Sequence, residues 1–236
     1  MKLCFVDERL SAECERALSD EGCTVVRIPP LAAVTPAIAS HTDISCFKCN
    51  NRIFVPKSRS EQFSAALYEG CDTVVIPCGT EPRSPYPTDT PYNALVIGRH
   101  LFARIDGLCP EIKEYIAECG ITAVNVKQGY AACTVLPVGD GAAITADKGM
   151  QKVLSECGIE VLLIRDDATI KLPPYSNGFI GGAATALGRK IFFFGNLDAI
   201  ADAKCIREFI IAHGYTPISL DESADALYDL GGAVFI

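Results

Sequence analysis

Three residues that lie far apart in this sequence, His41, Asp43 and Cys133, are of the types that carry out nucleophilic chemistry together. A cysteine thiolate is a strong nucleophile, and an imidazole beside it can lower the pKa of the thiol and carry protons to a leaving group. A carboxylate can orient that imidazole or hold a cationic substrate. These residues can act as a set only if the fold brings them together, so the elements that position them must be identified.

Each of the three residues also has an ordinary interpretation. The chain contains twelve cysteines and three histidines, and in a reducing compartment most cysteines are small buried core residues. On composition alone, Cys133 is more often such a core thiol than a nucleophile, and Asp43 alone is more often a turn or capping residue. His41 precedes Asp43 by two residues at the start of an expected strand, whereas His100 is expected in a hairpin turn and His213 at a helix end.

A metal site is not expected from the cysteine spacing. Cys46 and Cys49 form the only C-x-x-C pair, and the sequence offers neither a second such pair nor an H-x₃₋₅-H pattern, which a structural zinc site usually needs. The glycines at 178–182 do not form a dinucleotide fingerprint, because they open a strand rather than a helix. Walker lysine, G-x-S-x-G and H-E-x-x-H patterns are absent as well.

Composition narrows the class of protein. Among 236 residues, 49% are hydrophobic, and 21 Lys and Arg face 29 Asp and Glu, for a net charge of −8. A sizeable core is therefore available, and an acidic chain without clustered Lys and Arg does not suit nucleic acid as its main partner. No apolar stretch reaches the roughly 18–20 residues of a membrane span, and no signal peptide is recognisable. We therefore expect a cytoplasmic protein with no membrane partner.

One pattern recurs five times along the chain: an amphipathic helix, a capping glycine and a β-branched buried strand. The glycines expected to end these helices are Gly22, Gly70, Gly120, Gly158 and Gly214. A β-hairpin is predicted before four of the helices, with turns at Asn50-Asn51, Arg99-His100, Asp140-Gly141 and Gly188-Arg189. The repeating unit is therefore strand, strand, helix, strand.

The fifth unit is divided between the ends of the chain. Residues 226–236 supply a first strand, and residues 1–29 supply a second strand followed by a helix at Ser11–Gly22. Pairing the two end strands closes a ring, which removes exposed sheet edges. We expect one α/β domain over 1–236, a five-fold pseudosymmetric α/β-propeller of ββαβ units at 41–77, 91–126, 129–164, 178–220, and 226–236 with 1–29. The alternative, an open doubly wound sheet, explains the helices and following strands but not the hairpins.

In such a ring the starts of the first strands point toward a common centre. Aligning the hairpin turns of the first and third units puts Asp43 level with Cys133, and His41 two residues before that level. We therefore expect His41, Asp43 and Cys133 to meet at the mouth of a pocket. Asn93 and Asp229 fall near the first-strand starts of two other units and are weaker candidates for polar groups that bind the substrate.

Two long Pro-rich loops are expected on the same face, at 77–91 and 166–178. Loops of this length commonly cover functional sites, and a lid is one role for them.

A ring of five ββαβ units with His-x-Asp in one unit (HTDISCF) and a cysteine two units later (QGYAACTVLPVG) resembles the pentein fold of the guanidino-group-modifying enzymes. That superfamily includes arginine and agmatine deiminases, dimethylarginine hydrolases and amidinotransferases. The resemblance, which is to a short bacterial branch, implies that Cys133 attacks a guanidinium carbon, that His41 carries protons and that Asp43 holds the cation. It implies no metal or organic cofactor, and a small cationic guanidino compound as the ligand.

The resemblance leaves two classes of function open. Superfamily members generally carry a Glu/Asp-Gly-Gly element whose carboxylate meets the guanidinium, and this chain offers only Asp229-Leu230-Gly231-Gly232 and the acid-free Phe179–Gly182. The departure favours a catalytically inactive pentein that acts as a binding module, as in the ribosome anti-association factors. The set His41, Asp43 and Cys133 favours a hydrolase or amidinotransferase.

Overall fold

The structure, a computed structural model, describes residues 2–165 and 169–236. In this part of the chain five sheets have three strands each and one has two strands. In every three-stranded sheet the middle strand pairs antiparallel with one neighbour and parallel with the other. The sheets are β3 (Phe47–Cys49), β4 (Arg52–Pro56) and β5 (Val74–Cys78); β6 (Leu95–Ile97), β7 (His100–Ala103) and β8 (Thr122–Asn125); β9 (Val135–Pro137), β10 (Ala142–Thr145) and β11 (Glu160–Leu163); β13 (Ala184–Leu187), β14 (Lys190–Phe193) and β15 (Thr216–Ser219); and β17 (Val234–Phe235), β1 (Lys2–Asp7) and β2 (Cys23–Ile28).

A helix connects the two parallel strands of each of these sheets. These helices are α1 (Ala12–Asp20), α3 (Ser60–Ala66), α4 (Pro110–Glu118), α6 (Lys148–Glu156) and α7 (Ala203–Ala212). In α1, for example, the Ser11 side chain accepts a hydrogen bond from the backbone N–H of Cys14, and Cys14 and Leu18 point into the core. The left-handed Gly22 follows directly (φ +81°), as the sequence predicts. Gly70 is the exception, because α3 already ends at Ala66 and Gly70 lies in the following turn.

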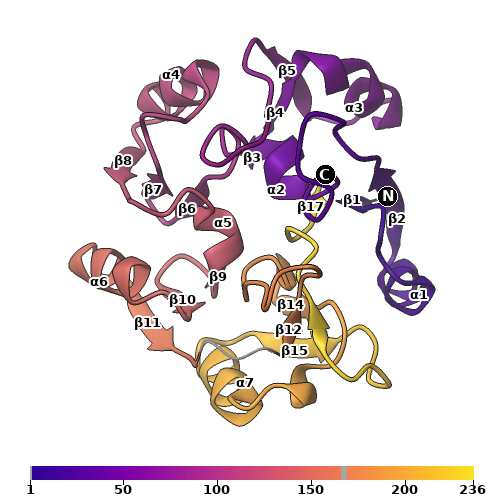
Figure 1. The fold of residues 1–236 in the computed structure, drawn as a ribbon, viewed down its shortest axis with the longest axis vertical. Helices are drawn as coiled ribbons and strands as arrows, with labels where there is room; N and C mark the ends of the chain where they lie inside the picture. The colour runs from indigo at the N-terminus through magenta and orange to yellow at the C-terminus, as the bar shows by residue number, and fades with distance from the viewer. Residues whose placement is uncertain (1, 166–168) are drawn as a thin grey trace.

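The two ends of the chain meet in one sheet. Phe5 of β1 lies opposite Val234 of β17, and the backbones of Leu3 and Ile236 exchange two hydrogen bonds of 2.8 and 2.9 Å. In Figure 1 the sheets with their helices follow one another around the middle of the view, in the order of the colour bar, and the last of them joins indigo to yellow. The predicted pairing of the terminal strands is therefore present.

Residues 226–236 do not form the single strand that was predicted. Leu227–Tyr228 is a separate strand, β16, which pairs with β12 (Ile170–Lys171), and only β17 pairs with β1. Gly231 and Gly232, both with positive φ, turn the chain between the two strands. The predicted loop at 166–178 thus contains a strand, β12, while its residues 166–168 lie outside the described residues.

The starts of two units also differ from prediction. Residues expected to begin strands form single helical turns instead, α2 (Thr42–Ser45) before β3 and α5 (Ala131–Thr134) before β9. Four residues are too few to leave a helical period in the sequence. In the second unit the hairpin turn is Gly98-Arg99, with Gly98 at φ +57°, so His100 begins β7 rather than lying in the turn.

The core is divided into clusters between neighbouring sheets and helices. One of them contains Cys49, Phe54, Cys78, Leu101 and Cys109, and so joins the β3–β5 sheet to the β6–β8 sheet and α4. In the described part of the chain, no helix has the length and apolar character needed to cross a membrane.

Candidate active site

The five polar residues selected from the sequence lie together in the structure. His41 caps α2 and Asp43 lies within it, Cys133 lies in α5, Asn93 precedes β6, and Asp229 lies between β16 and β17. The Cys133 thiol donates to Asp43 Oδ2, and one side-chain atom each of His41, Asp43 and Cys133 lies within 4.8 Å of the others. The alignment of hairpin turns had predicted this meeting. The catalytic roles of these residues remain a prediction.

Asn93 holds the nucleophile candidate from one side. Its Nδ2 donates to Cys133 Sγ at 3.6 Å, and its Oδ1 accepts from the backbone N–H of Ala132 at 2.8 Å. Because Asn93 is 1% exposed, its amide is fixed by these contacts and not by water. Asn93 therefore orients both the Cys133 side chain and the helical turn that carries it.

The His41 imidazole lies among three carboxylates. Its Nδ1 is 3.9 Å from Asp43 Oδ1 and 3.9 Å from Asp229 Oδ1, and its Nε2 is 3.9 Å from Asp7 Oδ2. His41 is 1% exposed, yet neither ring nitrogen has a hydrogen-bond partner among the described residues. A buried, unpaired imidazole is costly, and a ligand that supplies the missing hydrogen bonds would remove this cost.

Asp7 is a site residue that the sequence did not indicate. It ends β1, is fully buried, and accepts three hydrogen bonds from Arg9, one of them from the backbone. Its carboxylate reaches His41 because β1 packs beside α2, which His41 caps. Sequence spacing offered no signal for that contact.

Burial determines the protonation of the site. It lowers the pKa of His41, and it raises the pKa of Asp43 to about 8, with the charge of Asp229 adding to the rise. Burial, together with the charges of Asp43 and Asp229, raises the pKa of Cys133 well above its ordinary value. At neutral pH the site therefore holds a neutral imidazole, a protonated Asp43 and a thiol. A cation entering among these groups would favour their ionised forms.

Two Gly-Gly pairs allow backbone to approach the site closely. The backbone N–H of Gly182 donates to the Cys133 carbonyl at 2.9 Å, and that of Gly231 donates to Asp229 Oδ1 at 3.1 Å. A Cβ on Gly182 would overlap the Asp229 carboxylate, and one on Gly231 would overlap His41. In the sequence these pairs are departures from a Glu/Asp-Gly-Gly element: Leu230 separates Asp229 from Gly231, and no acid precedes Gly181. In the structure their lack of side chains is what admits Asp229 to the site.

We expect Gly182→Ala to destabilise the protein by about 1–3 kcal/mol, because the new methyl group must displace Asp229. Urea unfolding followed by circular dichroism measures this loss. Gly141→Ala is the matched control: a Cβ at Gly141 meets no atom within 4 Å, so this variant should be as stable as the wild type or slightly more stable. Equal stability of both variants would mean that Asp229 has room to move.

A cavity of about 400 Å³ opens beside Cys133, His41 and Asp229. Its walls include Tyr86, Tyr130 and Tyr175, and no Lys or Arg is found among the described residues that line it. Tyrosine rings and carboxylates together suit a flat organic cation.

The wall of this cavity is anchored through Tyr130. Its hydroxyl donates to Asp89 Oδ2 at 2.8 Å, and the second oxygen of this buried carboxyl has no partner among the described residues.

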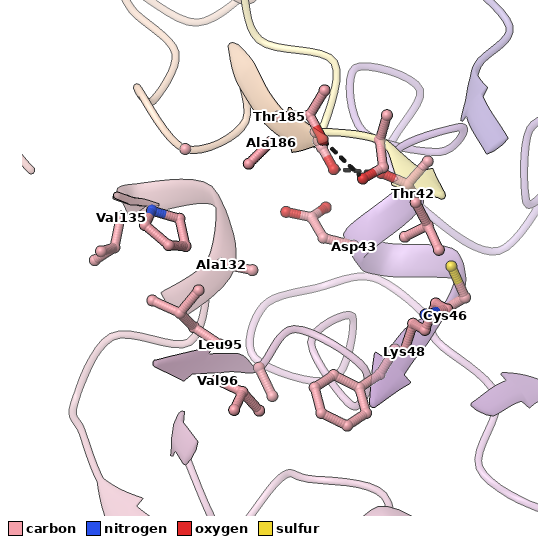
Figure 2. Close-up of a pocket in the computed structure, with 18 of the residues that line it drawn as sticks. Thr42, Asp43, Cys46, Lys48, Leu95, Val96, Ala132, Val135, Thr185 and Ala186 are labelled. Atoms are coloured by element: carbon pink, nitrogen blue, oxygen red, sulfur yellow. Dashed lines mark hydrogen bonds between the residues drawn. The ribbon is translucent and has the colours of Figure 1, made fainter. Parts of the chain in front are cut away.

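A second cavity, of about 460 Å³, lies on the other side of Asp43, among the starts of the sheets. Figure 2 shows the Asp43 carboxylate pointing into it, with Leu95 and Ala132 on one side and Thr185 on another. Since Cys133 lines the first cavity and Asp43 the second, the contact between these two side chains lies between the cavities.

The arrangement suits attack by Cys133 on an electron-poor carbon held among carboxylates, with His41 in reach to move a proton. The same three side chains, His41, Asp43 and Cys133, also have the donor types and proximity to hold a metal ion.

Comparisons with known proteins give a family and a fold. Residues 5–234 match a family of unknown function (DUF6873), and no curated protein matches the chain in sequence. Among solved structures, the chain is similar to the N-terminal domain of ArgZ bound to product, an arginine dihydrolase from the ornithine-ammonia cycle in cyanobacteria. The TM-score is 0.56 at 13% identity, covering 97% of this chain and 99% of that one.

Two further similar structures are of a hydrolase and an amidinotransferase. DDAH, dimethylarginine dimethylaminohydrolase, from Pseudomonas aeruginosa in complex with citrulline gives a TM-score of 0.52 at 12% identity, covering 94% of this chain and 92% of that one. SxtG, an amidinotransferase from Microseira wollei in the saxitoxin biosynthetic pathway, gives 0.51 at 12% identity, with 91% and 76% covered. These proteins are pentein-superfamily members, so the predicted resemblance is confirmed at the level of an α/β pentein fold.

Proposed function

The chain belongs to the DUF6873 family, and we propose that it is a cysteine-dependent hydrolase or amidinotransferase acting on a guanidino or amidino compound of the arginine, agmatine or methylarginine kind. One observation carries this proposal: the Cys133 thiol touches the Asp43 carboxyl, within 4.8 Å of an unpaired, buried imidazole. The adjacent cavity presents Asp229 and tyrosines, which suits a planar cation. The three similar solved structures named above are of enzymes whose names refer to arginine, dimethylarginine or amidino transfer.

In the proposed first half-reaction, the bound guanidinium shifts Asp43 toward its ionised form, and the Cys133 thiol passes its proton to His41. The thiolate forms a C–S bond to the guanidinium carbon. The C–N bond to the leaving amine then breaks as His41 returns the proton to that nitrogen, which leaves an S-alkylthiouronium on Cys133.

In the second half-reaction His41 accepts a proton from water, and the resulting hydroxide attacks the same carbon. The C–S bond breaks, the Cys133 sulfur takes the proton back from His41, and the added hydroxyl releases its own proton to solvent as a neutral ureido product leaves. An acceptor amine in place of water would make the reaction an amidino transfer. Asp43 and Asp229 hold the cation in both halves, while Asn93 keeps Cys133 oriented.

The wider organisation is part of the same proposal. We interpret the five three-stranded sheets as a five-fold pseudosymmetric propeller forming one domain over 1–236, with unit limits as predicted. All twelve cysteines are free, which is consistent with a reducing, cytoplasmic location. A small cation is the expected ligand, and no nucleic-acid or membrane partner is predicted.

A panel of guanidines tests the function. Arginine, agmatine, monomethylarginine and a simple alkylguanidine are incubated with the protein, and ureido product and released amine are quantified against a blank. We expect turnover of at least one compound. Product formed equally well by a Cys133→Ser variant would contradict the proposed chemistry.

A non-catalytic binding module is the second candidate, because burial keeps Cys133 in its thiol form. Such a module would bind a guanidinium in calorimetry and form neither product nor a covalent adduct. Detection of the thiouronium adduct by intact mass after rapid acid quench would favour the enzyme.

A further inference from the structure

A second cluster of chemically active side chains lies outside the candidate active site. Cys78 ends β5, Cys109 caps the N-terminus of α4, and Glu111 lies in the first turn of that helix. The two sulfur atoms and one Glu111 carboxylate oxygen all lie within 4.8 Å of one another. Cys78 and Cys109 are 1% and 0% exposed, whereas Glu111 is partly exposed, so the cluster is closed on one side and reaches solvent on the other.

The fold holds these three side chains in place without a bound ion. The Cys109 thiol donates to Glu111 Oε2 at 2.9 Å, and Glu111 Oε1 accepts from the backbone N–H of Gly79 at 2.9 Å. The Glu111 carboxylate is therefore directed toward the end of β5, where Cys78 lies. Pro110 fixes the backbone between Cys109 and Glu111 at the helix start.

We propose that Cys78, Cys109 and Glu111 form a site for a thiophilic divalent cation, Zn²⁺ in the first place, with a fourth position on the solvent side beside Glu111. Two thiolates and one carboxylate are a donor set that zinc accepts, whereas Mg²⁺ and Ca²⁺ prefer oxygen alone. Ligand atoms around a tetrahedral zinc lie about 3–4 Å apart, so atoms already within 4.8 Å need to move little.

The sequence did not suggest this site, because its ligands do not follow a short spacing: Cys78 and Cys109 belong to different units. The C-x-x-C pair is split between two core clusters, with Cys46 in one and Cys49 in the other. Packing of the β3–β5 sheet against the β6–β8 sheet and α4 therefore creates the second metal-ligand candidate in the described residues.

A bound ion would tie together the two ends of the segment between Cys78 and Cys109. This segment carries Tyr86, Asp89 and Asn93, which line or support the candidate active site. The expected role is therefore structural. It can be tested independently of any activity at Cys133.

Cobalt titration provides the test, since Co²⁺ replaces Zn²⁺ and reports thiolate ligands through a charge-transfer absorption. Metal-free, reduced, full-length protein is titrated without oxygen, and zinc is then added. We expect one equivalent of cobalt to give the absorption and zinc to abolish it. Cys109→Ser should weaken cobalt binding at least about 100-fold, and Glu111→Gln about 10-fold or more.

Two further variants serve as controls. Cys49 is buried in the same core cluster but lies outside the ligand set, so Cys49→Ser should retain the absorption. Cys133→Ser should retain it too, which separates this site from the one containing His41 and Asp43. If Cys109→Ser does not fold, Glu111→Gln decides the question, because Glu111 is partly exposed and the change is isosteric.

Three results would overturn the proposal. The first is an absorption that survives in a folded Cys109→Ser variant or is unchanged in Glu111→Gln. The second is its loss in Cys133→Ser alone. The third is the absence of cobalt uptake by the reduced wild-type protein. In that case, peptide mapping of untreated protein shows whether Cys78 and Cys109 form a disulfide instead.

Discussion

Cys133→Ser is expected to lower the turnover of any guanidino substrate by a factor on the order of 10⁴ or more, while substrate binding is largely kept. Serine fits the space of the thiol, and Asn93 and Asp43 can hydrogen-bond its hydroxyl as they do the sulfur. The serine hydroxyl is a far weaker nucleophile than the thiolate, because it gives up its proton much less readily. Steady-state product formation gives the loss in kcat, and calorimetry with the same substrate gives the change in Kd.

Chemical labelling tests the same residue without a known substrate. A haloacetamidine carries a guanidine-like cation next to an alkylating carbon, and we expect it to modify Cys133 in preference to the other eleven thiols. Chloroacetamide, similar in size but neutral, is the matched reagent and should show no such preference. Peptide mapping by mass spectrometry identifies the labelled cysteine. Labelling spread evenly over exposed Cys119 and Cys205 would contradict a guanidinium-shaped site at Cys133.

Asp43→Asn is expected to abolish activity and yet to stabilise the protein at pH 8. The pKa of Asp43 is about 8 in the folded protein, against an ordinary value of 3.8. The folded state therefore keeps a proton that the unfolded chain releases above pH 4, so the free energy of unfolding falls as the pH rises from about 4 to 8. The Asp43→Asn variant has no carboxyl at this position, so its free energy of unfolding does not fall with pH for this reason. At pH 8 it should be more stable than the wild type by an amount on the order of a few kcal/mol.

Urea unfolding at pH 4, 6 and 8 measures this difference, which should grow with pH and be smallest at pH 4. Asp202→Asn is a control with the opposite expected effect. Hydrogen bonds from Arg165 lower the pKa of Asp202, so removing this carboxylate should slightly lower the free energy of unfolding at pH 8. A wild type and an Asp43→Asn variant with parallel stability curves would show that Asp43 is ionised in the folded protein. In that case Asp43 would carry a negative charge beside Cys133 at neutral pH.

Much of the architecture could be predicted from the sequence because the same unit recurs. The helix, capping glycine and strand pattern located most elements, and the divided fifth unit predicted the pairing of β1 with β17. The alignment of hairpin turns brought Asp43 and Cys133 to one level although 90 residues separate them. Repetition supplies this information because residues at equivalent positions of repeated units can be aligned with one another.

Features that do not recur from one unit to the next could not be predicted from the sequence pattern. The turns α2 and α5 are too short to show a period, and they replace the strands expected there. The contact of Asp7 with His41 and the approach of Gly182 to Asp229 join different units at positions that are not equivalent. Contacts of this kind depend on the relative placement of neighbouring units, which a pattern within one unit does not specify.

The sheet that joins the chain ends also has a consequence for folding. Every other three-stranded sheet is complete within one continuous stretch of chain, but β1 needs residues 234 and 235 as its antiparallel neighbour. Contacts between the most distant parts of a chain carry the largest loop-closure entropy and form slowly. Until β17 arrives, one edge of β1, with its buried-type residues Leu3 and Phe5, is open to pairing with another chain. The closure that places Asp229 and Gly231 beside His41 and Asp43 is therefore expected to be the last step of folding and the one most exposed to aggregation.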